Sequence, residues 1–133
     1  MCKLGDIILV YHYEDNGIQL GKHSFIVLND ESGEIQGLDY DMVCNVMSSF
    51  KSEEHKKKKL QYAENVLIKH NDANITDDYN NNKEGYIKAD QLYYFRKDKI
   101  QFDVIGCMSD DAFKELISLI ESLPVTHDIT DNL

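Results

Sequence analysis

The sequence predicts a mainly β fold with one helix at its C-terminal end, best accommodated by a small antiparallel β-barrel with an attached helix. Three observations lead to this prediction. Short β-branched and aromatic runs recur along most of the chain. Turn signals such as Asn16-Gly17 separate them. The last periodic segment keeps the i, i+3, i+4, i+7 spacing of a helix with one buried face.

The first half of the chain predicts strands joined by tight turns. The segment "IILVYHY" at 7–13 has strand composition, and the turn at Asn16-Gly17 leads back into a second strand at 24–29. Another turn follows, and one or two further strands are expected between 34 and 48.

The middle of the chain is polar. In "KSEEHKKKKL" at 51–60, acids come before lysines, which suits a short exposed helix or a loop. A solvated face is the default interpretation, and contact with an anionic ligand is the alternative. A strand is expected at 64–70, and the Asn- and Asp-rich residues 71–84 predict a long surface loop.

The last third predicts two strands and the helix. The segments 86–95 and 100–108 flank a short turn, and "SDDAFKELISLIESL" at 109–123 is expected to be helical with Ser109 as its N-cap. Residues 1–124 are therefore expected to form one domain, and residues 125–133 an acidic tail that frays.

Composition places the chain among globular proteins. It has 133 residues, of which 42% are hydrophobic and 29% charged. No apolar run is long enough to span a bilayer and the N-terminal segment does not resemble a secretory signal, so we expect a soluble, cytoplasmic protein. The spacing of Cys2, Cys44 and Cys107 indicates neither a disulfide framework nor a zinc site, and we expect no metal or cofactor.

The net charge of −10 argues at first against a nucleic-acid partner. However, residues 71–84 carry one Lys against four acids, and residues 109–133 carry one Lys against six. These two segments supply −8 of the −10, so the remaining body is close to neutral.

Three segments, taken in order, resemble one known family. They are "LGDIILV", "GKHSFIVLND" and "ADQLYYFRKDKIQFDVIGCMSDDAFKELISLIESL". Together they are similar to the MazF/PemK toxins of type II toxin–antitoxin systems, with the weakest match over 51–84. The resemblance implies an SH3-like (CcdB/PemK-type) antiparallel β-barrel with a C-terminal helix.

The resemblance also implies a function. Most members of this family are metal-independent, sequence-specific endoribonucleases that act on single-stranded RNA. The ribose 2′-OH attacks the adjacent phosphate and leaves a 2′,3′-cyclic phosphate and a 5′-OH. Such chemistry needs a base, an acid and cationic groups around the phosphorane. A homodimer and a cognate antitoxin protein are the partners that the resemblance implies.

The catalytic candidates follow from the family's positions. The family's Arg-Pro dipeptide falls on Lys22 and His23, and its hydroxyl residue falls on Ser48. The resemblance thus implies Lys22 as an electrostatic stabiliser, His23 as the acid/base and Ser48 as a ligand of a phosphate oxygen. Lys22 departs from the family because lysine lacks the planar fork with which arginine grips phosphate.

Further residues are RNA-binding candidates beside this set. They are Tyr13, Asn16 and Gln19 in the loop between the first two strands, and Ser49 and Lys51 next to Ser48. The histidines at 55, 70 and 127 lie in polar surroundings, and no role is expected of them.

Two alternatives stay open at this stage. One is a binding module on the same barrel, which binds a protein such as gyrase or is a catalytically silent relative. The other is an unrelated β-rich adaptor. The net charge and the Lys-for-Arg exchange favour a binding module. His23 and Ser48 favour the enzyme.

Overall fold

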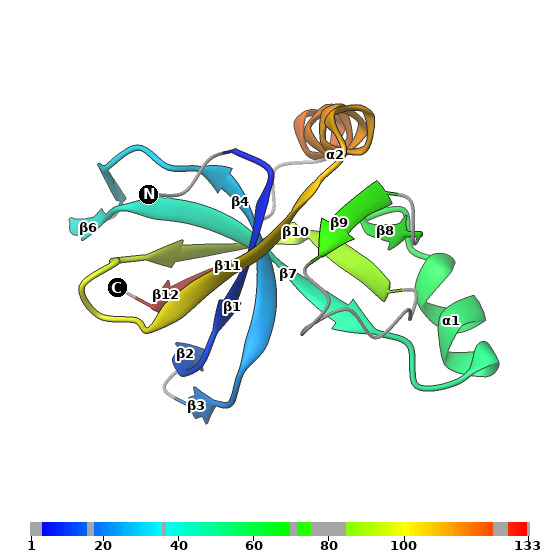
Figure 1. Ribbon diagram of the computed structural model, residues 1–133, viewed down its shortest axis with the longest axis horizontal. Helices are drawn as coiled ribbons and strands as arrows, with labels where there is room; N and C mark the ends of the chain where they lie inside the picture. The colour runs from blue at the N-terminus through cyan, green and yellow to red at the C-terminus, as the bar shows by residue number, and fades with distance from the viewer. Residues whose placement is uncertain are drawn as a thin grey trace.

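A strongly curved β-sheet forms the body of the protein, with two helices outside it (Figure 1). The computed structural model describes residues 4–15, 18–35, 37–69, 72–75, 85–123 and 128–132. The helices are α1 (Glu53–Leu60) and α2 (Asp110–Ser122). The strands are β1 (Asp6–Val10), β2 (Tyr13–Asp15), β3 (Ile18–Leu20), β4 (His23–Asn29), β5 (Gly33–Ile35), β6 (Leu38–Tyr40), β7 (Met42–Ser49), β8 (Asn65–Ile68), β9 (Ala73–Ile75), β10 (Gly85–Phe95), β11 (Phe102–Met108) and β12 (Asp128–Asn132).

The main sheet has eight strands within the described residues. Its path is β12-β10-β7-β4-β1-β11-β9, and β8 also pairs with β10. Every pairing is antiparallel except the one between β10 and β12. Hairpins β2–β3 and β5–β6 form two small separate sheets. The prediction of a mainly β fold with a C-terminal helix is confirmed. Within the described residues the sheet path has two ends, so the sheet is not closed into a barrel.

Apolar side chains cover both faces of the sheet. On β1, Ile8 and Val10 belong to one buried cluster, whereas Ile7 and Leu9 belong to another, because successive side chains of a strand point to opposite faces. Phe25 is fully buried in the first cluster, with its ring 5.1 Å from two other aromatic rings. The second cluster includes Leu116 of α2. Burial on both faces fixes the register of the central strands.

The long strand β10 contains a large bulge. Ile87 lies opposite Met47 and Leu92 lies opposite Asn45, so β10 advances by five residues while β7 advances by two. The fully buried Asn45 side chain donates from Nδ2 to the carbonyls of Gln91 at 2.8 Å and Ala89 at 3.4 Å. These hydrogen bonds give the bulged backbone partners that the ladder no longer supplies.

The predicted strands near 7–13, 24–29, 64–70, 86–95 and 100–108 are confirmed, with different ends. The polar residues 51–60 contain helix α1, and α2 begins after Ser109 as expected. No helix in the described ranges is long and apolar enough to cross a membrane.

Two predictions differ from the structure. Residues 73–75, inside the expected surface loop, form β9 on β11. Residues 128–132 of the tail expected to fray form β12, which pairs with β10. In both cases the edge of an already formed strand supplies backbone hydrogen-bond partners, which local composition does not reveal. The predicted turn at Asn16-Gly17 lies outside the described residues.

Candidate functional site

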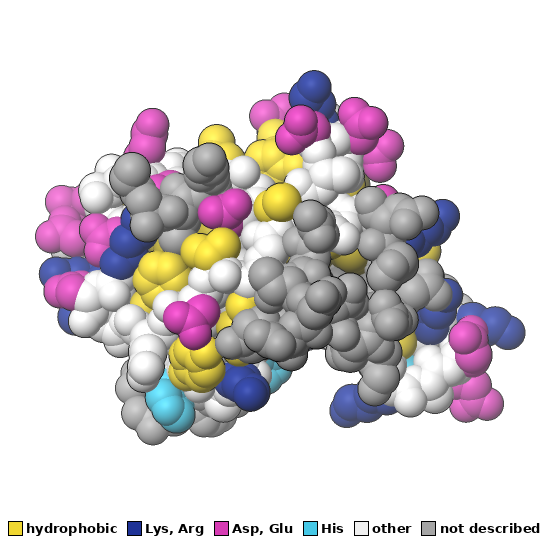
Figure 2. Space-filling view, in the orientation of Figure 1, with side chains coloured by type: hydrophobic (Ala, Val, Ile, Leu, Met, Phe, Trp, Pro, Cys, Tyr) yellow, Lys and Arg dark blue, Asp and Glu magenta, His cyan; other side chains and the backbone are white. Residues whose placement is uncertain are grey.

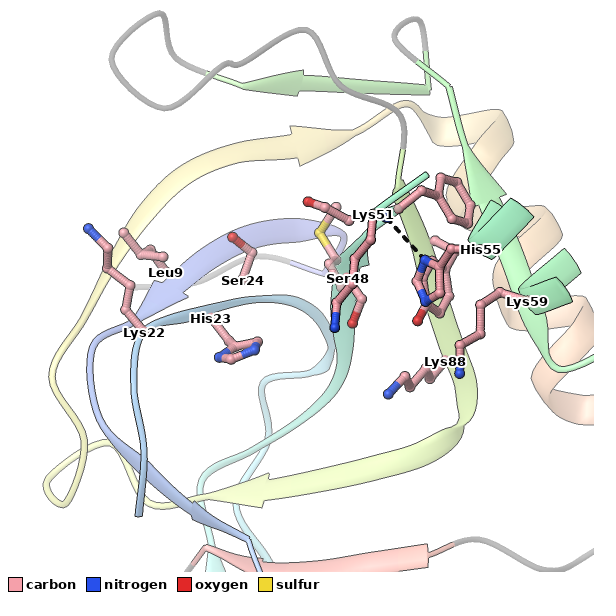
Figure 3. Close-up of a pocket in the computed structure, with 13 residues that line it drawn as sticks. Leu9, Lys22, His23, Ser24, Ser48, Lys51, His55, Lys59 and Lys88 are labelled. Carbon is pink, nitrogen blue, oxygen red and sulfur yellow. Dashed lines mark hydrogen bonds between the residues drawn. The ribbon is translucent and has the colours of Figure 1, made fainter. Parts of the chain in front are cut away.

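A groove of about 620 Å³ lies where β4, β7, β10 and α1 meet. It brings together the predicted residues Lys22, His23, Ser48, Ser49 and Lys51, which come from two segments of the sequence (Figure 3). The remaining lining residues are Leu9, Ser24, Met47, Phe50, His55, Lys59, Tyr86 and Lys88.

The sheet register aligns part of this groove. Ser24 pairs with Met47, so the next step of the same antiparallel register places His23 across from Ser48. Ser48 in turn pairs with Tyr86 on β10. Directly opposed residues share one face of a sheet, and Lys88 lies two residues beyond Tyr86 on the same strand. His23, Ser48, Tyr86 and Lys88 therefore belong to one face.

Lys22 lies differently from the other two catalytic candidates. Neighbouring residues of an extended chain point to opposite sides, so Lys22 and His23 do not both face Ser48. Figure 3 shows the Lys22 side chain extending away from Ser48, whereas Lys51 reaches beside Ser48. The structure thus places His23 and Ser48 on one face of the groove and Lys22 at its far side.

Helix α1 forms the other wall and is held mainly through its ends. The Ser52 hydroxyl accepts a hydrogen bond from the His55 backbone N–H at 3.1 Å. The Asn65 side-chain amide donates to the Lys59 carbonyl at 2.9 Å. Next to the helix, the Phe50 ring stacks on Tyr86 with centroids 5.0 Å apart. No α1 residue is buried, so the Asn65 bond and the contacts of the His55 ring with Phe50 and Tyr86 are what join the helix to the sheet.

The Nδ1 atoms of the two histidines in the groove have different roles in their hydrogen bonds. His55 Nδ1 accepts from the Lys51 backbone N–H at 3.1 Å, so its ring proton lies on Nε2. His23 Nδ1 lies 3.4 Å from the Gly21 carbonyl, which can only accept. In a neutral His23 the proton therefore lies on Nδ1, and Nε2 carries the lone pair. His55 is thus arranged as a donor and His23 as an acceptor.

The groove is cationic although the protein is acidic. Lys22, Lys51, Lys59 and Lys88 line it, and among its described lining residues there is no Asp or Glu. Among the residues that the structure describes, no carboxylate forms an ion pair with these four lysines. On the face shown in Figure 2, acidic side chains predominate around α2, whereas α1 has Glu53 and Glu54 in its first turn and lysines in its last turn. Such a separation of charge attracts anions to one part of an acidic protein.

The lysines also act on His55. Partial burial lowers the pKa of the His55 imidazole below its ordinary value of 6.5, and Lys59 and then Lys51 lower it further. Protonating this ring would add a positive charge beside existing ones. His55 is therefore neutral near pH 7, in agreement with the hydrogen bond that Nδ1 accepts.

Sequence reasoning missed three basic residues among those that line the groove. His55 was expected to have no role, and Lys59 and Lys88 were not singled out. The polar run at 51–60 was the signal that could have found His55 and Lys59. The sequence favoured a solvated face there, with contact to an anionic ligand as the alternative. Of the predicted loop residues, Asn16 lies outside the described residues. Tyr13 and Gln19 lie in β2 and β3, and their side chains lie outside the described part of the structure.

In the described ranges, no group of three or more His, Cys, Asp and Glu side chains is placed to hold a metal ion. Comparison of the chain with protein-family models, with curated proteins and with solved structures gave no match.

Proposed function

We propose that the protein is a metal-independent, sequence-specific endoribonuclease that cleaves single-stranded RNA by attack of the 2′-OH. One observation supports this most strongly. His23 and Ser48 lie one step beyond the Ser24–Met47 pair of β4 and β7, in a groove whose described lining has four lysines and no carboxylate. An imidazole acceptor, a hydroxyl donor and ammonium groups are what cleavage of a phosphodiester requires.

The proposed reaction assigns one task to each group. His23 Nε2 takes the proton from the ribose 2′-OH, whose oxygen then forms a bond to phosphorus. Ser48 donates a hydrogen bond to a non-bridging oxygen, and the Lys51 ammonium stabilises the charge of the phosphorane. The bond from phosphorus to the 5′-oxygen breaks, and this oxygen takes the proton that His23 Nε2 received from the 2′-OH. The products are a 2′,3′-cyclic phosphate and a 5′-OH.

Lys22 holds the position of the family's arginine. Because its side chain extends away from Ser48, we assign the stabilising role beside Ser48 to Lys51 as well. Kinship with the MazF/PemK toxins, their SH3-like barrel, a homodimer and a cognate antitoxin are parts of this proposal. The three collinear segments support it, together with the mainly β sheet and C-terminal helix.

The direct test uses purified protein in excess chelator with a long single-stranded RNA. We expect cleavage at a short recurrent sequence and 2′,3′-cyclic phosphate ends. Ser48→Ala should slow cleavage at least about tenfold, since loss of a charge-stabilising donor typically costs more than that. Ser122→Ala on α2 is the matched control, because its hydroxyl bonds only within its own helix. RNA that stays intact at high protein concentration would rule out the enzyme.

A binding module without catalysis is the second candidate. The direction of the Lys22 side chain favours it. Lys22 stands at the position of the family's arginine, and its side chain extends away from Ser48. A wall of lysines is sufficient to hold a polyanion without any reaction. This candidate predicts that the protein binds RNA and leaves its length unchanged.

A further inference from the structure

The groove has a second group of polar side chains beyond the proposed reaction site. His55 and Lys59 come from α1, and Lys88 comes from β10. Figure 3 shows Ser48 between His23 on one side and this group on the other. Besides partial burial, Lys59, Lys51, Lys58 and Lys88 all lower the pKa of His55, and of these Lys59 and Lys88 line the groove beyond Ser48. The three side chains therefore form one cluster, separate from His23.

The chemistry of this cluster suits one kind of ligand. Two ammonium groups supply positive charge, and His55 presents Nε2–H as a donor because Nδ1 is occupied by the Lys51 N–H. All three groups can donate hydrogen bonds to a ligand, and the one acceptor among them, His55 Nδ1, is already bonded to the Lys51 N–H. A phosphate group matches them, since its oxygens only accept and carry negative charge.

The proposed reaction at Ser48 does not involve the positive charges of Lys59 and Lys88. One phosphodiester carries a single negative charge, and Lys51 already lies beside Ser48, where the cleaved phosphate is proposed to bind. Lys59 and Lys88 have no carboxylate partner among the described residues. An RNA strand has one phosphate per nucleotide. When one phosphate is bound beside Ser48, the strand therefore brings a second negative charge into the groove.

We propose that His55, Lys59 and Lys88 form a second phosphate subsite, which binds a phosphate of the RNA strand other than the phosphate beside Ser48. The proposal deepens the proposed function and rests on it for the identity of the strand. The second phosphate is either the next internal phosphodiester or a terminal phosphate. The chain is thus built to hold a strand at two points and not only at the cleaved bond.

Binding of an uncleavable strand tests the subsite apart from the reaction. The probe is a fluorescent single-stranded DNA ten-mer, which has no 2′-OH and cannot be cut. We expect Lys59→Ala and Lys88→Ala each to weaken its binding severalfold. Each should also lower the slope of log affinity against log salt by about 0.7, the value for one phosphate contact on a single strand. Lys57→Ala is the matched control, because Lys57 lies on the same helix and does not line the groove.

His55 is tested by two substitutions. His55→Ala should weaken binding, and His55→Gln, which keeps an N–H donor, should restore part of the loss. Equal effects of Lys57→Ala and Lys59→Ala would overturn the subsite. Binding of the ten-mer would then depend on the total positive charge of α1 and not on the position of Lys59. Failure of the native protein to bind the ten-mer would also overturn it. So would preferential binding of poly-glutamate through Lys59, which would indicate a protein partner.

Cleavage of short RNAs locates the subsite. A dinucleoside monophosphate has only the cleaved phosphate, so Lys59→Ala should slow its cleavage less than that of a ten-nucleotide RNA. Equal slowing of both would place Lys59 at the cleaved phosphate and overturn the proposal. Dinucleotides with a terminal phosphate, compared with trinucleotides, separate a terminal from an internal ligand. If the ten-mer binds through Lys59 while no RNA is cut, the nuclease proposal fails and the subsite stands.

Discussion

The two walls of the groove are built in different ways. The sheet wall carries His23 and Ser48 on strands whose register is fixed by apolar side chains buried on both faces. The helix wall carries His55 and Lys59 on α1, which buries none of its own residues. The proposed base and hydroxyl donor, which must keep a fixed distance from each other, thus lie on the wall that the core supports. Positive charge, which acts over several ångströms, is placed on the wall with less support.

The two histidines show the same contrast. His23 is arranged as a proton acceptor opposite Ser48, and His55 as a neutral donor among lysines. A base must titrate to work, whereas a permanent donor is more useful when its protonation does not change. Similar side chains in one groove are therefore assigned different tasks by their surroundings.

The largest expected effect separates these two histidines. His23→Ala should reduce the single-turnover rate of RNA cleavage about 10²–10⁴-fold, because it removes the proposed base. His55→Ala should act mainly on the substrate concentration needed for half-maximal rate. Rapid-quench kinetics at saturating RNA measures both. If His55→Ala slows cleavage at saturating RNA as much as His23→Ala does, the assignment of His23 to the reaction and of His55 to binding is wrong.

The next effect concerns the support of Ser48. A Cβ added at Gly85 would lie 2.6 Å from the Ser48 carbonyl oxygen, so β7 and β10 would have to separate. We expect Gly85→Ala to destabilise the fold by about 1–3 kcal/mol, as overpacking does, and to slow RNA cleavage. Gly21→Ala is the control, because nothing lies within 4 Å of its added Cβ. Urea unfolding of both variants gives the comparison, and equal stabilities would contradict this role of Gly85.

A smaller effect distinguishes the two helices. Ser52 caps α1 and Ser109 caps α2, each accepting a hydrogen bond from a backbone N–H in the first turn. Ser109→Ala should lower the free energy of global unfolding by about 1 kcal/mol, because α2 packs Leu116 into the core. Ser52→Ala should loosen only α1 and weaken RNA binding. Hydrogen exchange at 53–60 measures that loosening. A large global loss from Ser52→Ala would show that α1 is part of the cooperative core.

The smallest effect is the titration of His55. Its ring should titrate below 6.5, and Lys59→Ala should raise the midpoint, because one of the charges that lower the pKa is removed. Since the pKa is lower in the folded state, the unfolded chain binds more protons below pH 6.5, and His55 costs stability as the pH falls through that range. NMR titration of the ring signals measures the midpoint. A midpoint above 6.5 would mean that His55 is not held neutral.

Much of the site was within reach of the sequence. Lys22, His23, Ser48, Ser49 and Lys51 were predicted as functional, and all five line one groove. The sequence could not show that Lys22 turns away from Ser48, because that depends on where β4 begins. It also could not show that Lys88 joins the groove, since the bulge held by Asn45 decides how β10 runs.

The sequence by itself determined the elements whose signals are local. Strand composition, the Ser109 cap and the apolar spacing of α2 depend on neighbours along the chain, and they predicted a mainly β fold with a terminal helix. Only the tertiary structure decided that β9 and β12 pair with distant strands, and that His55 of a polar helix faces Ser48 across a groove. The physical reason is that strand pairing and cationic clusters depend on groups far apart in sequence, whose meeting is set by the packing of the whole chain.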